Sequence, residues 1–409
     1  YKRQLIVWDE APMNHKQCFE TLDRSLRDVL KGSKPGFDDL PFGGKPILFG
    51  GDFRQILHVV PNGTKADIVE ASLTSSYLWP YLTIFFLKEN MRLSKTGLNE
   101  KEKQELADFA NWILQIGNGS VTNSILSIDE ENSWVEISKD FLIDFEDNPI
   151  ENMVSAVYTD FQRNFHDVSY LKERAIVTPR NDTVTEINDF MLTMVPGENR
   201  TYLSFDSVSS STENVENLDI LYPLEFLNQL DLPGLPHHKL ALKVGMPVML
   251  LRNLNQSSGL CNGTRLVVMQ LTDRIVEAKI ITGSNIGERV YIPRIITESS
   301  QNKYPFTLRR RQFPLRICYA MTINKSQGQS LKIVGLFLSQ TVFSHGQLYV
   351  ALSRVTSKKG LKIVIAHDCD MPYGYTKNIV YKDVLNRLHE GVLVCVCPFI
   401  FLFLFLPIF

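Results

Sequence analysis

Short apolar runs that end at polar or glycine-rich residues constrain the fold of this chain most. Three of them, Leu5–Trp8, Pro46–Phe49 and Thr83–Leu87, have the length and composition of buried strands. Between the first two, Lys16–Leu30 carries apolar residues at helical spacing. Strands that alternate with helices predict a parallel α/β sheet, in which ligands bind beyond the carboxyl ends of the strands.

The alternation continues further along the chain. Arg174–Thr178, Ile317–Thr322 and Ile333–Leu338 have the composition of buried strands. Helical spacing is found in Leu98–Ile116 and again between the first of these strands and about Met194. A helix is also expected to begin near residue 324, directly after the second strand.

From Lys243 onward the residue pattern changes to short runs of strand-forming residues separated by turns. The expected strands are Met246–Leu251, Thr264–Leu271, Arg274–Thr282 and Arg289–Ile292. This spacing predicts a small all-β insertion of the kind that closes into a barrel. Upstream, the serine-rich segment Ser204–Asn217 is expected to be a polar loop.

Charge is distributed unevenly along the 409 residues, although the net charge is only −2. Val121–Leu240 holds 22 acidic and 7 basic residues, whereas Gln301–Glu390 holds 14 basic and 4 acidic residues. A basic segment of this size fits a polyanionic partner. It also fits a solvated face that the acidic segment balances after folding, and composition leaves both interpretations open.

The cysteines and the apolar end of the chain are less informative. No two of the six cysteines form a C-x-x-C pair, so neither a zinc site nor a disulfide scaffold is indicated. Gly391–Phe409 carries no charge and is long enough to cross a bilayer, but Pro398 and Pro407 interrupt it. We therefore expect no membrane partner, and the origin of this tail is left open.

Two acidic residues directly follow the first expected strand. In LIVWDEAP, the strand would deliver Asp9 and Glu10 to the edge of the sheet. Paired carboxylates there suit a nucleotide-hydrolysing site, in which one orients Mg²⁺ and the other polarises water. Two solvated acids at the end of a strand are an equally common arrangement.

Polar residues also follow the second and third expected strands. In GGDFRQ, Gly51 would let a ligand approach the backbone beside Asp52, and Arg54 and Gln55 could hydrogen-bond a phosphate or water. The alternative is a glycine turn with an exposed arginine. Arg92 follows the third strand in LKENMRL, where a surface position is the usual explanation.

Two motifs in the basic segment complete the set. AMTINKSQGQS places Thr322, Ser326 and Gln327 near a helix N-terminus, which suits either phosphodiester contacts or an ordinary N-cap. Arg354 follows the apolar run of QLYVALSR, where it could be an arginine finger or a surface residue.

The ordered set DEAP, GGDFRQ, ENMRL, TPRN, TINKSQGQS and YVALSR resembles the petite-integration-frequency (Pif-type) DNA helicases of superfamily 1B, over roughly residues 1–385. The subgroup of Helitron transposon helicases and their plant relatives looks most similar. The resemblance implies an α/β fold with two RecA-like parallel-sheet domains, the first incomplete, and a small β-barrel insertion similar to Src-homology-3 domains. The implied boundaries are 1–95 for the first domain, 96–255 and 316–390 for the second, 256–315 for the insertion and 391–409 for the tail.

The resemblance also implies an ATP site between the two domains, with Mg²⁺ as the second cofactor. The implied catalytic and cofactor-binding residues are Asp9, Glu10, Gly51, Asp52, Gln55, Arg92 and Arg354. Asp9 would hold Mg²⁺, Glu10 would activate the attacking water and Gln55 would sense the γ-phosphate. The two arginines would neutralise charge in the transition state.

For DNA, the resemblance implies contacts from the segment after the Ile317–Thr322 strand and from the basic edge KYPFTLRRRQFPLR. The implied residues are Thr322, Lys325, Ser326, Gln327, Gly328, Arg309, Arg310 and Arg311. Bases could stack on Tyr304 or Phe306, but packing of both rings in a core is equally expected. Single-stranded DNA and forked duplexes would be the partners.

Three departures from the family pattern qualify these expectations. The phosphate loop G-x-x-x-x-G-K-[ST] does not occur, since the nearest candidate, Gly44-Lys45, is followed by Pro46. We expect this loop upstream, in which case the present chain is truncated. Asn324 stands where the family usually has histidine, and His58 stands where proline is usual.

The main hypothesis is thus an ATP-dependent 5′-to-3′ DNA helicase that acts in replication, repair, recombination or telomere maintenance. It would be a monomer in the nucleus, with the mitochondrion as the other location, and the truncated chain itself would be inactive. One alternative is a non-catalytic nucleic-acid-binding remnant. Another is a protein anchored in a membrane by its apolar tail.

Overall fold

The computed structural model describes residues 5–32, 39–87, 99–121, 132–145, 147–209, 222–299, 304, 306–366, 372–390 and 400–404. The chain forms two compact units. Unit 1 comprises Tyr1–Asp144, Ser326–Lys332 and Leu336–Phe409, and unit 2 comprises Phe145–Lys325 and Ile333–Gly335. These units do not follow the expected boundaries, because residues 96–144 group with the first 95 and not with the second domain.

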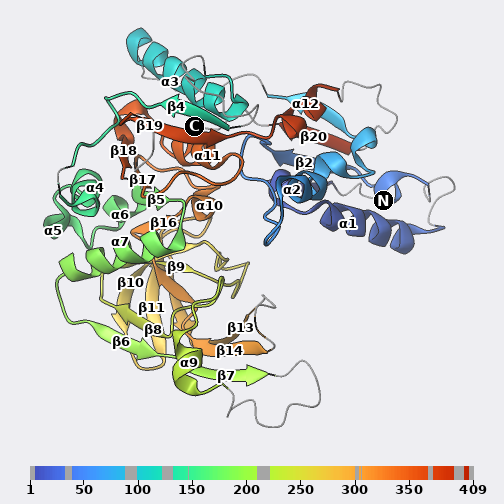
Figure 1. The fold of residues 1–409 in the computed structure, drawn as a ribbon. Coiled ribbons are helices and arrows are strands. Elements are labelled where there is room, and N and C mark those ends of the chain that lie inside the picture. The colour runs from blue at the N-terminus through green and yellow to red at the C-terminus, as the bar shows by residue number, and fades with distance from the viewer. Residues whose placement is uncertain are drawn as a thin grey trace. The chain divides into compact units, whose positions relative to one another are not determined.

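Unit 1 contains a sheet in the order β1-β2-β20-β3, in which all pairings are parallel (Figure 1). The strands are β1 (Ile6–Trp8), β2 (Ile47–Gly51), β3 (Thr83–Phe86) and β20 (Ile400–Leu404). The predicted parallel α/β sheet is confirmed. The prediction that all three N-terminal strands are buried is wrong, because Val7 is 64% exposed and Phe85 is 40% exposed. β1 has a neighbour on one side only among the described strands, which leaves part of it open to solvent.

The apolar tail contributes β20 to this sheet, so its described part is a strand. Among the described residues, none of the helices has the length and apolar composition that crossing a membrane requires.

The helices of unit 1 are α1 (Lys16–Leu30), α2 (Lys65–Ala71), α3 (Glu100–Asn118), α11 (Gln347–Ser353) and α12 (Lys382–Glu390). The bounds of α1 are those predicted, and the ring of its Phe19 lies 5.1 Å from that of Phe49 on β2. A capping box between Asn99 and Glu102 starts α3, and the left-handed Gly119 ends it. Unit 1 also contains β18 (Leu361–Ile365) and an antiparallel pair, β4 (Asn132–Glu136) and β19 (Tyr375–Ile379).

The α/β part of unit 2 is built on β5 (Arg174–Thr178), which is fully buried and parallel to β16 (Ala320–Thr322). Its helices are α4 (Pro149–Val157), α5 (Phe161–Asn164), α6 (Val168–Lys172) and α7 (Asn181–Met194). Both β5 and the helix that follows it end where predicted. β17 (Ile333–Leu338) also has the predicted bounds, and α10 (Ile323–Ser326) begins at the expected place.

The β-rich part of unit 2 holds an antiparallel sheet in the order β12-β11-β10-β9-β15. The strands are β9 (Pro247–Leu250), β10 (Arg265–Leu271), β11 (Ile275–Ile280), β12 (Arg289–Pro293) and β15 (Leu315–Ile317). The four predicted strands are confirmed. The core of this sheet also includes Tyr202 and Leu240, from the antiparallel pair β6 (Arg200–Leu203) and β8 (Lys239–Leu242), so the β-rich part begins well before residue 256.

A smaller antiparallel sheet joins β13 (Ile295–Glu298), β14 (Thr307–Gln312) and β7 (Phe205–Ser209). The predicted loop at 204–217 is therefore wrong for β7, while residues 210–217 lie outside the described residues. α9 (Leu224–Gln229) contributes Leu227 to a core that contains Phe306, with Tyr304 packed against it. Both rings pack in or against this core, as expected in the alternative to base stacking.

Candidate functional site

A tight turn holds the two carboxylates that follow β1. Glu10 has left-handed backbone angles, φ 52° and ψ 41°, and its N–H donates to Asp9 Oδ1 at 2.9 Å. This conformation is costly for a residue with a side chain, so the turn is constrained. Burial raises the pKa of Glu10, and the charges of Asp9 and Asp52 raise it further. A raised pKa suits a carboxylate that accepts a proton near neutral pH.

Asp52 follows β2 and is only 2% exposed. Its Oδ1 accepts from Arg54 N–H at 3.0 Å and Arg54 Nη1 at 3.2 Å, and its Oδ2 accepts from the Tyr349 hydroxyl at 2.6 Å. Asp52 therefore fixes two neighbouring side chains. The preceding Gly51 is required for packing, because a Cβ there would lie 2.3 Å from Cδ of Pro12.

Gln327, which the sequence predicts as a DNA contact, lies instead beside the carboxylates. Its Nε2 donates to Gln55 Oε1 at 2.7 Å and to Glu10 Oε2 at 3.4 Å. This bond lowers the pKa of Glu10, although burial outweighs it. The buried Oε1 of Gln327 has no hydrogen-bond partner among the residues that the structure describes. We call Asp9, Glu10, Asp52, Gln55 and Gln327 the carboxylate cluster.

Arg354 is 8% exposed, directly after α11. Its Nε donates to Val350 O at 3.0 Å, its Nη1 to Gln329 O at 3.2 Å and its Nη2 to Ser353 Oγ at 2.8 Å. Burial lowers the pKa of Arg354, and its charge lowers the pKa of Glu10. The predicted arginine thus acts on the cluster electrostatically, and its role as an arginine finger stays a prediction.

Sequence reasoning missed His345, which supports the segment after β2. Its Nε2 lies 2.8 Å from Phe53 O, and its Nδ1 accepts from Tyr381 N–H at 2.8 Å. Burial lowers the pKa of His345 to about 4, so the ring is neutral at physiological pH. Beside it, a Cβ on Gly346 would lie 2.4 Å from Arg54 O, so α11 begins directly against the Arg54–Gln55 peptide. A lone histidine between a serine and a glycine gives no sequence signal of this kind.

The cluster fits the expected Mg²⁺. Within the described residues there is no group of three or more histidine, cysteine or acidic side chains that could hold a metal. Mg²⁺ needs few protein ligands, because it keeps several waters and binds the phosphates of its substrate. The repulsion that raises the pKa of Glu10 beside Asp9 and Asp52 is relieved by a cation, and Asp9 is the residue that would hold it. Arg92 lies outside the described residues.

Two other predicted DNA contacts, Thr322 and Lys325, line a cavity of about 490 Å³ within unit 2. Arg252 and Arg316 line the same cavity, and so does Asn262, whose Oδ1 accepts from Lys325 Nζ at 3.0 Å. Desolvation and the charge of Arg252 lower the pKa of Lys325. We call this the cationic cavity. Arg252 was missed, although it follows β9 as the predicted residues follow their strands.

Ser326 and Gly328 are placed differently. Ser326 is 0% exposed, so its hydroxyl is not available to DNA in this structure. Gly328 is exposed, with φ +76° and nothing near a Cβ position. The left-handed backbone conformation favours glycine at this position, so a close approach of DNA is not needed to account for it.

The three arginines of β14 do not share one environment. Arg310 is 0% exposed and forms a buried ion pair with Asp206 at 2.6 Å, while its other N–H groups donate to carbonyls that include Leu227 O. This argues against a phosphate contact by Arg310. Arg309 lies on the opposite face, paired with Glu298 at 3.1 Å, and Arg311 is exposed on that face.

The parallel sheets, with polar residues at their carboxyl ends, place the chain in the class of RecA-like α/β proteins. Residues 1–125 match the family described as PIF1-like helicase, and residues 225–271 match the DNA helicase Pif1, 2B domain. The chain belongs to the PIF1-like helicase family.

Among curated relatives, the chain is 33% identical to human ATP-dependent DNA helicase PIF1, over 88% of the chain and 46% of that protein. It is 32% identical to the Pif1 helicase of Bdellovibrio bacteriovorus, over 88% of the chain and 65% of that protein. The chain thus spans about half the length of the human relative. A Bacteroides Pif1 helicase in complex with ADP-AlF3 and ssDNA has a similar fold, with a TM-score of 0.58 and 20% identity over 95% of this chain and 75% of that one.

Proposed function

We propose that this chain is the motor part of an ATP-dependent 5′-to-3′ DNA helicase. The observation that carries the proposal is the bond from Gln327 to both Gln55 and Glu10. It joins the segment expected to contact DNA to the residues expected to contact ATP. A motor needs such a link, because DNA must alter the nucleotide site and nucleotide must alter the grip on DNA.

In the nucleotide site, Asp9 would hold Mg²⁺ and Glu10 would activate the attacking water. The constrained turn and the raised pKa of Glu10 support this division. Gln55 would sense the γ-phosphate, with Arg92 and Arg354 neutralising charge. ATP bound with Mg²⁺ supplies the phosphoryl group. The 409 residues encode no G-x-x-x-x-G-K-[ST] loop, so turnover is proposed for a protein that contains one.

The nucleic-acid partner would be single-stranded DNA, and forked duplexes at the point of unwinding. Thr322, Lys325, Arg252 and Arg316 line a cavity whose side chains carry three positive charges and one negative charge, that of Asp231. The excess of positive charge suits a phosphodiester backbone. The Bacteroides relative is in complex with ssDNA, and a second similar Pif1 structure, with a TM-score of 0.58, concerns unwinding at forked dsDNA. We propose a monomer that works in the nucleus, or in mitochondria, in replication, repair, recombination or telomere maintenance.

A second candidate is a nucleic-acid-binding protein without catalysis. The absence of the phosphate-loop motif from these 409 residues favours it, because that loop's lysine and amides anchor the β- and γ-phosphates. Both candidates predict DNA binding, and only the first predicts turnover once a phosphate loop is supplied.

A phosphate-release assay separates the two. We expect residues 1–409 to hydrolyse ATP at the background rate with or without single-stranded DNA. A longer protein that adds the phosphate loop should show DNA-stimulated turnover, and its Glu10→Gln variant should lose it. If the longer protein binds DNA but DNA never stimulates turnover, the helicase proposal fails and the binding protein remains.

A further inference from the structure

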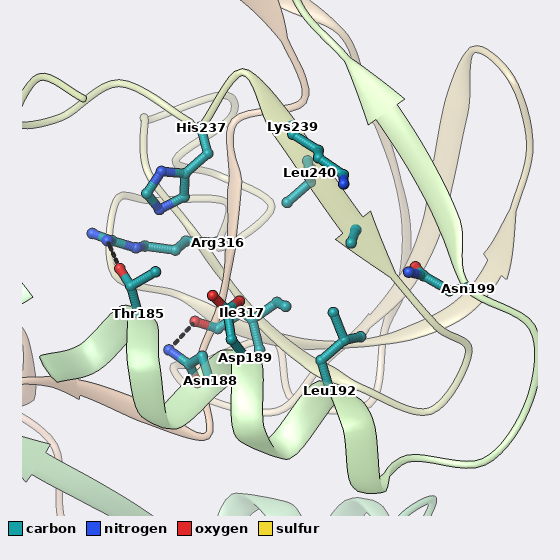
Figure 2. A pocket seen from close by; sticks show the side chains of 11 residues that line it. Thr185, Asn188, Asp189, Leu192, Asn199, His237, Lys239, Leu240, Arg316 and Ile317 are labelled. Atoms are coloured by element: carbon teal, nitrogen blue, oxygen red, sulfur yellow. Dashed lines mark hydrogen bonds between the residues drawn. The ribbon is translucent and has the colours of Figure 1, made fainter. Parts of the chain in front are cut away.

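A second cavity in unit 2, of about 300 Å³, lies between α7 and the strands β8 and β15. Asp189 and Leu192 of α7 line this cavity. On the other side it is lined by Lys239 and Leu240 of β8, by His237 just before that strand, and by Arg316 of β15. Figure 2 shows these side chains around one space. We call it the α7 cavity. Its volume is at the lower end for ligand pockets, which suits a single ring system.

The polar groups of the α7 cavity leave capacity for a ligand. Asp189 is exposed, and within the described part of the chain it makes no hydrogen bond or ion pair and acts on Arg316 and His237 only through its charge. Arg316 donates to two neutral acceptors, Asn181 Oδ1 at 3.2 Å and Thr185 Oγ1 at 2.9 Å. Asp189 and Arg316 therefore both line the cavity without forming a direct ion pair with each other.

The remaining walls suit the faces of a flat ring. Leu192, Leu240 and Ile317 supply apolar surface. Burial and the charge of Arg316 lower the pKa of His237, which favours a neutral imidazole at physiological pH. The Nδ1 of His237 lies 3.5 Å from Asp231 Oδ1, so the ring can stack on a base or use Nε2 for one hydrogen bond with it.

The two cavities of unit 2 share a wall, because Arg316 and Ile317 line both. If phosphates of a single strand occupy the cationic cavity, as in the function proposed above, the α7 cavity adjoins them across Arg316 and Ile317. This inference therefore rests on that proposed function.

We propose that the α7 cavity takes one guanine base of the bound single strand. Guanine carries two adjacent N–H donors, N1–H and the N2 amino group, which match the two oxygens of Asp189. It also carries the acceptors O6 and N7, which match a cationic side chain such as Lys239. Adenine and cytosine place a ring acceptor beside their amino group, which would face the carboxylate unpaired. Thymine has one N–H between two carbonyls.

Fluorescence anisotropy of the 409-residue chain tests this with three labelled oligonucleotides at one salt concentration. The first is an oligo-dT, the second has one central dG, and the third has inosine at that place and so lacks only the N2 amino group. We expect the dG oligonucleotide to bind on the order of tenfold more tightly than oligo-dT, with inosine between them.

Asp189→Asn should remove the preference for dG and leave the affinity for oligo-dT unchanged. Glu186→Gln is the matched control, because it makes the same change on an exposed side chain of α7 outside the cavity, and it should keep the preference. Equal affinity of the wild-type chain for dG and dT oligonucleotides would overturn the inference alone, as would a preference that survives Asp189→Asn. Failure to bind any of the three at low salt would overturn the proposed function and this inference together.

Discussion

The carboxylate cluster of unit 1 and the cationic cavity of unit 2 differ in how their charged side chains are bonded. In the cluster, Asp52 is buried and bonded on both oxygens, and Gln327 bridges Gln55 and Glu10. In the cavity, Arg316 donates to the neutral acceptors Asn181 Oδ1 and Thr185 Oγ1, and Lys325 Nζ donates to Asn262 Oδ1, an amide oxygen. Most of the polar groups of the cluster bond one another, whereas the cations of the cavity have no direct ion pair with Asp231, the carboxylate that lines it, in the part of the chain that the structure describes.

The difference indicates how the two sites would respond to ligands. A ligand of the cluster must displace existing bonds, so it changes the geometry of groups such as Gln327. A ligand of the cavity adds bonds to groups already in place. The helix α10 supplies residues to both units, since Lys325 belongs to unit 2 and Ser326 to unit 1. The segment 325–327 thus connects Lys325 of the cationic cavity, whose groups are already in place, with Gln327 of the carboxylate cluster, whose bonds a ligand would change.

The largest expected effect concerns the cluster. In a longer protein that carries a phosphate loop, Arg354→Ala should lower ATP turnover on the order of 10³-fold, as expected for loss of an arginine finger. Binding of single-stranded DNA should change little. Phosphate release measures the first and anisotropy the second. Lys358→Ala, which removes an exposed charge nearby, is the control, and wild-type turnover in Arg354→Ala would refute the assignment.

The second effect concerns the β-rich part of unit 2. Arg310→Ala leaves Asp206 buried without its partner and should cost about 3–5 kcal/mol in the free energy of unfolding. Arg311→Ala changes an exposed side chain on the other face of β14 and should stay within about 0.5 kcal/mol. Urea unfolding compares them. Similar losses in both variants would contradict the buried placement of Arg310.

The third effect is a pH dependence that arises in unit 1. The pKa of His345 is about 4 in the folded protein and about 6.5 when unfolded. Its contribution to stability is full above pH 6.5 and falls as the pH drops toward 4, because only the unfolded chain takes up the proton. The loss approaches about 3 kcal/mol across this window. Unfolding at several pH values should show it, His345→Gln should remove it and His58→Gln should keep it.

The sequence predicts the positions of strands better than the partners of side chains. Apolar runs located β2, β5 and β17 because burial on both faces leaves a pattern in each run alone. Gln327 could not be placed this way, since its partners are 272 and 317 residues away. The interior position of Arg310 does have a local signal, because alternate residues of β14 face opposite sides and Leu308 and Gln312 share its buried face.

The smallest expected effect decides which basic residues of unit 2 meet DNA. Replacing Arg252 and Lys325 together by glutamine should flatten the dependence of log affinity on log salt. Each phosphate contact with a single strand contributes about 0.7 to that slope, so the expected change is about 1.4. Anisotropy titrations at several salt concentrations measure it.

The matched control neutralises Arg309 and Arg311, which lie on the exposed face of β14. Because Glu298 already pairs with Arg309, this double variant should change the slope less than the cavity variant does. If the β14 variant flattens the slope and the cavity variant does not, DNA follows β14. The cationic cavity would then be a solvated surface, and its contrast with the carboxylate cluster would have no functional meaning.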